Sequence, residues 1–397
     1  MTSALETSFA SVRFKNPVVA ASTDLSRTEA GLTSLLKAGG GVVTKSVTDI
    51  EALTSRHITR FDIRDMRQNP VRGDVPRDYV FFSRGGNMVP LAHYLPHAER
   101  ELAAAKEYGA VLIGSISCND GDSWPKYARE LAREGFPLLE LNFGNPHGEA
   151  AKGKAGFLLG QSPELCRRIV SEVCSAVSIP VVVKLTPQVT DITEIAAVVR
   201  DAGAAAVTVM HRLQGLVVDF EKEEPVIGGW AAIGVPWMKP LSLAAVAKVY
   251  RSAGLPVCGG NGVDTGRDVL EYIMAGASLV QIGSTLMLRG PHCIPAILDE
   301  MRSLMAAKGV TAIGGLTGRV ADKIVTYKEL AALGTREAAF DAARCAECRD
   351  KPCIARCAFG TLSAQGHALS VKPETCTGCS MCQHICPFGA VTLRITG

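Results

Sequence analysis

The spacing of cysteines at the end of the chain constrains its fold more than any other feature of the sequence. Eight of the thirteen cysteines fall within the last 53 residues, in two runs. The second run reads Cys376-x2-Cys379-x2-Cys382-x3-Cys386-Pro387, a spacing with which bacterial proteins hold [4Fe–4S] clusters. The first run reads Cys345-x2-Cys348-x4-Cys353-x3-Cys357; it has two more residues in its middle gap, and Ala358 stands in place of the proline.

In paired runs of this kind, the fourth cysteine of each run reaches the cluster held by the other run. This rule predicts two ligand sets: Cys345, Cys348, Cys353 and Cys386, and Cys376, Cys379, Cys382 and Cys357. A zinc ribbon also uses CxxC pairs, but zinc takes four ligands per site and no CxxCxxC triplet. We therefore predict two [4Fe–4S] clusters in a small α+β domain of the bacterial-ferredoxin type over residues 345–397.

The rest of the chain alternates short apolar runs with amphipathic stretches of helical period. Continuous apolar runs are typical of parallel strands that are buried on both faces. Eight such units over roughly 300 residues predict a (β/α)8 TIM barrel over residues 1–315. An open doubly wound sheet is the alternative, and the absence of GxGxxG after the first strand weighs against it. The predicted strands are 18–22, 41–47, 111–117, 138–143, 181–186, 206–210, 256–260 and 279–284.

Residues 316–344 separate the predicted barrel from the predicted ferredoxin domain. Helix-favouring residues fill 327–332 and 336–343, and Gly334-Thr335 interrupts them. We predict a helical connector.

Composition and charge exclude several classes of function. Lys and Arg total 42 against 39 Asp and Glu, and the basic residues are scattered, so we expect no nucleic-acid partner. The first residues have no basic segment followed by an apolar one, and no window approaches 18 uninterrupted apolar residues. We therefore expect no membrane association and a cytoplasmic location, where cysteines are seldom paired in disulfides.

Polar residues follow the predicted strands at the end where barrels carry their chemistry. Glycines after the seventh and eighth strands are typical of a phosphate site. A phosphorylated cofactor beside iron–sulfur clusters favours FMN, because a flavin exchanges single electrons with clusters and a hydride with substrates. The polar residues are Thr44, Lys45, Ser46, Asn142, Lys184, Thr186, His211, Arg212, Asn261 and Ser284, and the glycines are Gly259, Gly260 and Gly283.

On these motifs the chain resembles the flavin–iron–sulfur part of dihydropyrimidine dehydrogenases and, more broadly, dihydroorotate dehydrogenases. The resemblance runs from about Val12 to the end of the chain. It is carried by Asn16-Pro17, Ser115-Ile116-Ser117-Cys118-Asn119, Glu140-Leu141-Asn142, Gly160-Gln161-Ser162-Pro163-Glu164-Leu165 and Lys184-Leu185-Thr186-Pro187-Gln188-Val189-Thr190-Asp191, followed by the cysteine runs.

The resemblance implies roles for residues at the matching positions. Lys45 and Lys184 would contact the flavin ring, where a cation stabilises the anionic reduced form. Asn87 and Asn142 would hydrogen-bond flavin or substrate. Other residues would complete the cofactor site, with Gly259, Gly260, Gly283 and Ser284 at the phosphate and Ala20, Ala21, Ser22 and Thr44 at the ends of the first two strands.

Two departures from the family pattern point to a different substrate. Asn145 stands where dihydropyrimidine dehydrogenases carry a proton-donating cysteine, and an amide cannot act as a general acid. His211-Arg212 replaces an Asn-Thr pair that reads the pyrimidine amide edge. Arginine pairs with carboxylate or phosphate, and histidine is the natural proton donor when cysteine is absent.

We therefore expect Arg212 to anchor an anionic group and His211 to supply the proton. His147 and Cys118 are further candidate donors. The alternative is that Arg212 pairs with Asp219 or Glu221 and that His211 only packs.

These observations predict an FMN- and iron–sulfur-dependent oxidoreductase acting on a C=C or C=N bond of a small, cyclic, unsaturated substrate. We expect this substrate to differ from the family's substrate and to be anionic. A true dihydropyrimidine or dihydroorotate dehydrogenase, a non-catalytic electron-transfer subunit, and a barrel that has lost FMN are the alternatives. No NAD(P)H fingerprint is present, so we expect a separate redox partner, either an FAD/NAD(P)H subunit or a ferredoxin, and a homo- or hetero-oligomer.

Overall fold

The computed structural model describes residues 4–119, 121–148, 154–366 and 368–396. The chain divides into two compact units, Met1–Lys323 and Ile324–Gly397, and each is described by itself.

The first unit is built on a closed barrel of eight parallel strands. Each strand pairs with the next along the barrel, and β18 pairs with β3 to close it. Each of the eight predicted runs coincides with a barrel strand in whole or in part, so the (β/α)8 prediction is confirmed and the open-sheet alternative is wrong. The strands in order are β3 (Val18–Ala20), β4 (Gly41–Val43), β9 (Val111–Ile116), β10 (Leu139–Asn142), β11 (Val181–Lys184), β12 (Ala206–Val209), β17 (Val257–Gly260) and β18 (Ala277–Ile282).

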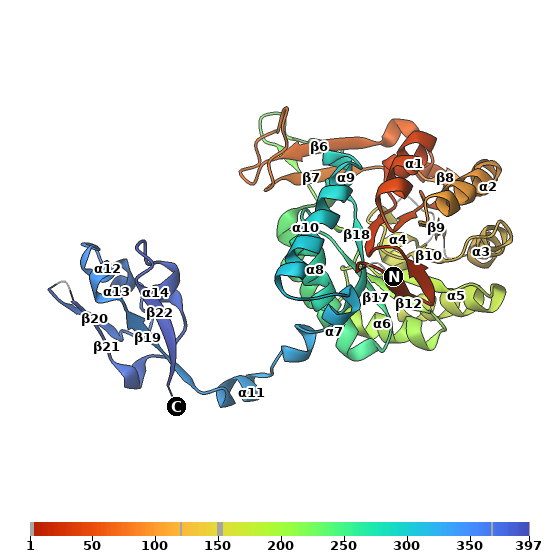
Figure 1. The fold of residues 1–397 in the computed structure, drawn as a ribbon. Coiled ribbons are helices and arrows are strands. Elements are labelled where there is room, and N and C mark those ends of the chain that lie inside the picture. Colours follow the sequence, from red (N-terminus) through yellow and green to blue (C-terminus); the bar gives the residue numbers. More distant parts are fainter. Residues whose placement is uncertain (1–3, 120, 149–153, 367, 397) are drawn as a thin grey trace. The chain divides into compact units, whose positions relative to one another are not determined.

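Helices surround the strands, as Figure 1 shows. Several begin at capping side chains that satisfy free N–H groups of the first turn. Ser162 caps α5, Asp191 caps α6, and Thr265 forms a capping box with Asp268 at α8. The helices are α1 (Glu29–Ala38), α2 (Leu91–Glu107), α3 (Ser123–Arg133), α4 (Gly156–Gly160), α5 (Pro163–Ala176), α6 (Ile192–Asp201), α7 (Lys239–Ala253), α8 (Gly266–Met274), α9 (Ser284–Arg289) and α10 (Cys293–Ala307).

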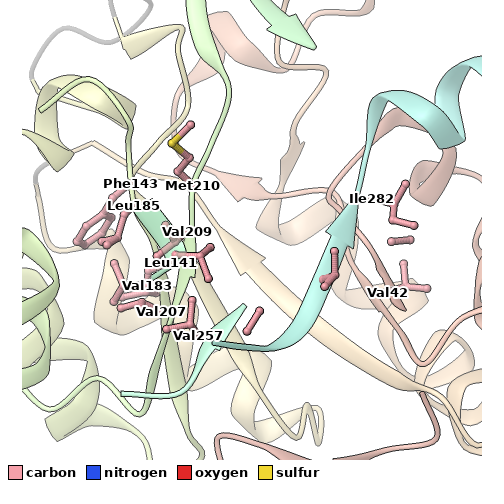
Figure 2. Close-up of a cluster of buried hydrophobic side chains, with 14 of the residues drawn as sticks. Val42, Leu141, Phe143, Val183, Leu185, Val207, Val209, Met210, Val257 and Ile282 are labelled. Carbon is pink, nitrogen blue, oxygen red and sulfur yellow. The ribbon is translucent and has the colours of Figure 1, made fainter. Parts of the chain in front are cut away.

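Successive side chains of the barrel strands divide between two apolar clusters, because side chains alternate across a strand. Val42, Val183, Val207 and Val257 belong to the larger cluster, which includes the helix faces (Figure 2). Their chain neighbours Val43, Val182, Ala206 and Cys258 belong to the second cluster, inside the barrel. The hairpin of β1 (Thr7–Phe9) and β2 (Val12–Phe14) adds Phe9 and Phe14 to that inner cluster.

A four-stranded antiparallel sheet, which the sequence did not predict, stands beside the barrel. Its order is β13 (Leu213–Gly215), β16 (Ala231–Gly234), β7 (Val80–Arg84) and β6 (Arg60–Arg64). The β6–β7 pair comes from the segment after β4, and the β13–β16 pair from the segment after β12. Two excursions that are distant in sequence therefore share one sheet.

The second unit pairs β19 (Thr335–Phe340) with β22 (Val391–Thr396) and carries a hairpin of β20 (Leu362–Gln365) and β21 (Ala368–Val371). Short helices α12 (Ala342–Ala346), α13 (Pro352–Ala355) and α14 (Met381–His384) lie between the strands. Such a small α+β arrangement is the predicted ferredoxin-like fold.

The predicted connector 316–344 is helical only in part. Helix α11 covers Tyr327–Ala332, but 335–340 forms β19, so the helix predicted over 336–343 is wrong. The six-residue antiparallel pairing with β22 explains the difference, because tertiary pairing outweighs a weak helix propensity. No helix among the described residues is long and apolar enough to cross a membrane.

Candidate active site

A pocket with a cavity volume of about 110 Å³ opens at the carboxyl ends of the barrel strands, bounded on one side by the antiparallel sheet. Of the residues predicted for the site, those that line the pocket are Ala21, Ser22, Lys45, Lys184, His211, Arg212, Gly259, Gly260, Gly283 and Ser284. Those outside the lining are Ala20, Thr44, Asn87, Asn142, Asn145, His147 and Cys118. Phe61, Tyr79, Phe81 and Ser83, which the sequence did not single out, form the sheet side of the lining.

Lys184 ends β11 in a buried polar network. Its Nζ donates to Oε1 of Gln281 at 2.5 Å and lies 3.8 Å from Oε1 of Glu140. Glu140 accepts further hydrogen bonds from Gln281 Nε2 at 2.6 Å and from Thr208 Oγ1 at 2.8 Å. A buried carboxylate requires such partners, so the network fixes the Lys184 amine at the pocket wall.

Lys45 lies across the pocket in an ion pair with Asp24, at 2.9 Å. Burial lowers the pKa of Lys45, and Asp24 opposes the shift. Asn87 donates to the same carboxylate at 3.1 Å and accepts a hydrogen bond from Arg27. Asn87 therefore acts on the pocket through Asp24, which lines it.

His211 and Arg212 follow β12 directly. The backbone N–H of Arg212 donates to Nδ1 of His211 at 2.8 Å. Burial, with the nearby charges of Lys184 and Arg212, holds the pKa of His211 well below its usual range. The ring is therefore neutral near pH 7, with its proton on Nε2.

Two neighbours determine where His211 lies. Asn261, at a left-handed φ of 79°, donates from Nδ2 to the carbonyls of Met210 at 2.9 Å and His211 at 3.2 Å. Gly144 leaves room for the ring, since a Cβ on it would come within 2.4 Å of the His211 Cβ.

Arg212 projects into the pocket with its guanidinium held by β7. Its Nη1 donates to Oγ of Ser83 at 2.8 Å, and burial lowers its pKa to about 10. Asp219 pairs instead with Lys222 at 3.1 Å. In the part of the chain that the structure describes, Arg212 is the cation of the lining that forms no ion pair, whereas Lys45 and Lys184 each face a carboxylate.

Asn145 and the two further candidate proton donors, His147 and Cys118, are buried and lie outside the lining of the pocket. Asn145 accepts the backbone N–H of His147 at 3.2 Å. Burial and the cations Arg212, Arg84 and Lys45 lower the pKa of His147 to about 4. Burial and Asp49 raise the pKa of Cys118 well above its usual value, which keeps it a thiol.

The glycines at the strand ends serve different purposes. A Cβ on Gly259 would approach the Tyr272 ring at 2.5 Å, so this glycine permits helix packing. Gly283 has only Ala21 within 4 Å, at 3.7 Å from its hypothetical Cβ, which leaves space for a ligand beside its backbone. Thr23 also lines the pocket, and its buried Oγ1 has no partner among the described residues. Two lysines, backbone N–H groups and this hydroxyl form a donor set that fits a flavin phosphate and ring.

Four cysteines of the second unit line one small cavity of about 20 Å³: Cys357, Cys376, Cys379 and Cys382. These are the four predicted ligands of the second cluster. Thr361 Oγ1 lies 3.2 Å from Sγ of Cys357, and this contact lowers the pKa of that thiol to about 7, which favours a thiolate ligand.

Three of the other four cysteines are buried near one another. Cys345 and Cys348 contribute to the raised pKa of Cys353, whose main cause is burial. Cys382 of the second run contributes as well, so the two groups of thiols adjoin. Cys386, the predicted fourth ligand, accepts the backbone N–H of Ala390 at 3.2 Å.

Comparison with known proteins identifies the family. The dihydroorotate dehydrogenase family model matches residues 4–305. This chain belongs to the dihydroorotate dehydrogenase family. A 4Fe-4S binding domain model matches residues 369–392, which contain the second cysteine run.

Curated relatives are similar over most of the chain. A protein of Methanocaldococcus jannaschii is 31% identical over 308 residues, 77% of this chain and 95% of the relative. One of Methanothermobacter thermautotrophicus is 30% identical over 323 residues, 80% of this chain and 99% of the relative. Both are named catalytic subunits of dihydroorotate dehydrogenase B (NAD(+)). About a fifth of this chain therefore lies outside the region that aligns with the Methanothermobacter thermautotrophicus protein.

The family and its domains define the protein's class. This dihydroorotate dehydrogenase family member is a flavin oxidoreductase acting on CH–CH bonds, and it carries a 4Fe-4S domain. The broader of the two resemblances drawn from the sequence is thereby confirmed, whereas the narrower one, to dihydropyrimidine dehydrogenases, stays a prediction.

Proposed function

We propose that this protein adds or removes two electrons and two protons at a C=C or C=N bond of a small, cyclic, anionic substrate. FMN in the barrel and two [4Fe–4S] clusters in the second unit would carry the electrons. They would be exchanged with a separate protein, either an FAD/NAD(P)H subunit or a ferredoxin.

The unpaired guanidinium of Arg212 is the observation that carries this proposal. It lines the pocket, Ser83 fixes its direction, and within the described residues it forms no ion pair; the nearby Asp24 is already paired with Lys45. A half-buried cation without a counter-ion is costly unless a ligand supplies the negative charge. Arginine binds planar carboxylates with two parallel hydrogen bonds, so a carboxylated ring is the favoured ligand.

The pocket residues would hold FMN as follows. Lys45 and Lys184 would contact the ring, and the backbone at Gly260, Gly283 and Ser284 would bind the phosphate. When bound, FMN supplies hydride-transfer chemistry, which leaves the protein to orient the substrate and handle the proton.

His211 is the favoured proton-handling group, because it lines the pocket beside Arg212 whereas Asn145, His147 and Cys118 do not. Its low pKa keeps the ring neutral near pH 7, which is the form that can accept a proton when the substrate is oxidised. In the reducing direction it needs a proton first. A bound anion would neutralise Arg212, one of the charges that lower the pKa of His211, and so would favour protonation.

Dihydroorotate oxidation or orotate reduction is the second candidate. The relatives named above favour it, and orotate is itself a carboxylated ring that Arg212 could anchor. Reduction of an uncharged pyrimidine is less favoured for two reasons. An uncharged ring supplies no counter-charge to Arg212, and the amide of Asn145 cannot donate the proton that such a reduction needs.

An anaerobic half-reaction tests the proposal. The purified protein would be checked for FMN and iron, reduced with dithionite, and mixed with orotate, uracil or thymine while flavin absorbance is followed. Reoxidation by orotate, lost in Arg212→Gln but kept in the surface variant Arg60→Gln, would identify the carboxylate role of Arg212. Reoxidation by uracil or thymine that survives Arg212→Gln would contradict it. FMN bound but unreactive towards every carboxylated ring tested would favour a non-catalytic electron-transfer subunit.

A further inference from the structure

A buried lysine lies in the lengthened gap of the first cysteine run. Lys351 stands between Cys348 and Cys353 and is 7% exposed. Its Nζ donates to the backbone carbonyls of Cys345 and Cys348, at 2.7 Å each. The ammonium group is therefore folded back against the segment that supplies two predicted ligands of the first cluster.

The backbone at Lys351 is adapted to this position. It has a left-handed φ of 42° and precedes Pro352, the first residue of α13. A side chain in this conformation costs about 1 kcal/mol compared with glycine. Glycine would remove the strain but also the ammonium group, so the strained lysine indicates that the side chain matters here.

Lys351 has no carboxylate partner. Within the described ranges, no ion pair involves it, and its hydrogen bonds are to neutral carbonyls. Burying an ammonium group without a counter-charge is expensive. A [4Fe–4S] cluster with four thiolates is anionic in both oxidation states, and more so when reduced, so it would supply that counter-charge.

We propose that Lys351 is the counter-charge of the first cluster and raises its reduction potential. This inference rests on the two-cluster part of the proposed function. The potential of a cluster depends on nearby charge and on exposure to solvent. Burial of Cys345, Cys348 and Cys353 disfavours the more negative reduced state, and the adjacent cation offsets that effect.

The second cluster has no equivalent need. Cys379 is exposed, and Cys376, Cys382 and Cys357 are partly exposed, so solvent can stabilise the charge of a cluster there. Lys372, which lies in the same unit, is an exposed residue. It provides a matched control, because water screens its charge.

The test is a redox titration of the whole protein followed by electron paramagnetic resonance. Iron analysis comes first and shows whether both clusters are present; a single cluster would contradict the two-cluster proposal rather than the role of Lys351. The variants are Lys351→Gln, which keeps an N–H donor without charge, Lys351→Arg, which keeps the charge, and Lys372→Gln.

In Lys351→Gln we expect the potential of one cluster to become more negative. The ratio of reduced to oxidised cluster at fixed potential should fall at least tenfold, which is a shift of about 59 mV for one electron. Lys351→Arg and Lys372→Gln should stay near the wild-type potential.

Two results would overturn the proposal. One is an unchanged potential in Lys351→Gln with both clusters assembled. The other is loss of iron from both Lys351→Gln and Lys351→Arg, which would show that the fit of the lysine against the two carbonyls matters and its charge does not.

Discussion

The backbone N–H of Arg212 donates to Nδ1 of its neighbour His211 at 2.8 Å, which leaves Nε2 of the ring as the nitrogen that bears a proton. Arg212 therefore acts on His211 in two ways. Its backbone N–H donates a hydrogen bond to Nδ1, and its side chain places a positive charge near the ring. Burial, followed by the positive charges of Lys184 and Arg212, holds the pKa of the ring well below its usual range.

Anion binding should take up protons. The pKa values of His211 and His147 are both lowered by burial and by Arg212, and that of His147 to about 4. A bound anion cancels part of this charge and raises both values, so affinity should increase as the pH falls below about 6.5. The gain should be at most about tenfold per pH unit for each proton taken up. The dissociation constant of orotate, read from the flavin spectrum between pH 7.5 and pH 5, checks this; a flat profile would contradict it.

Arg212→Gln should weaken binding of a carboxylated substrate. A hydrogen bond to a charged group contributes about 1.5–3 kcal/mol, so KM should rise roughly tenfold to a hundredfold. Flavin content should stay the same, because the flavin contacts are expected from other residues. Steady-state kinetics of Arg212→Gln, Arg212→Lys and the surface control Arg60→Gln measure the effect, and equal KM values in all three would show that Arg212 does not bind substrate.

Lys184→Met should destabilise the barrel by about 3 kcal/mol, because it leaves Glu140 buried without its cation. Glu140→Gln added to it should restore part of the loss, since an uncharged amide needs no counter-ion. Chemical unfolding of both variants followed by circular dichroism tests the pair. A double variant less stable than Lys184→Met would mean that the hydrogen bonds of Glu140 matter more than its charge.

Gly144→Ala should slow turnover without unfolding the protein. The new Cβ would come within 2.4 Å of the His211 Cβ, so the ring must move away from its position beside Arg212. Gly314→Ala is the matched control, because a Cβ there meets nothing within 4 Å. We expect kcat to fall in the first variant alone, by at least about tenfold. Equal kcat values in the two variants would remove His211 from the proton-handling role.

Single cysteine changes should separate the two clusters. Cys357→Ser should disturb the cluster of Cys376, Cys379 and Cys382, with which it shares a cavity, although it belongs to the first run. Cys386→Ser should disturb the other cluster. Iron content and paramagnetic resonance of the reduced variants test this crossed ligation, and loss of the same cluster in both variants would contradict it.

The barrel could be predicted because its strands are buried on both faces and therefore appear as uninterrupted apolar runs. The polar residues at their ends followed from that placement. The antiparallel sheet could not be predicted, because its strands are short and its two central strands, β7 and β16, pair across more than a hundred residues of sequence. Ser83 was missed for that reason. Strand β19 was missed because its alanines also favour a helix, and only the pairing with β22 decides between them.

Lys351 illustrates a different limit. The lengthened gap was visible in the sequence, but nothing in the spacing tells whether its lysine points to solvent or is folded inward. Asp24 was missed likewise, since its role depends on two contacts, with Lys45 and Asn87, that meet only in the folded chain.

The pocket is assembled from two independent sources. The barrel strands supply the wall with Lys45, Lys184 and the strand-end glycines, whereas Ser83 and the aromatic residues come from the excursion sheet. Because that sheet joins two loops without contributing a barrel strand, it can diverge while the strand ends stay unchanged. The two loops are the segment with β6 and β7 and the segment with β13 and β16. Grafting both onto a related barrel should therefore transfer substrate specificity, and grafting either alone should not.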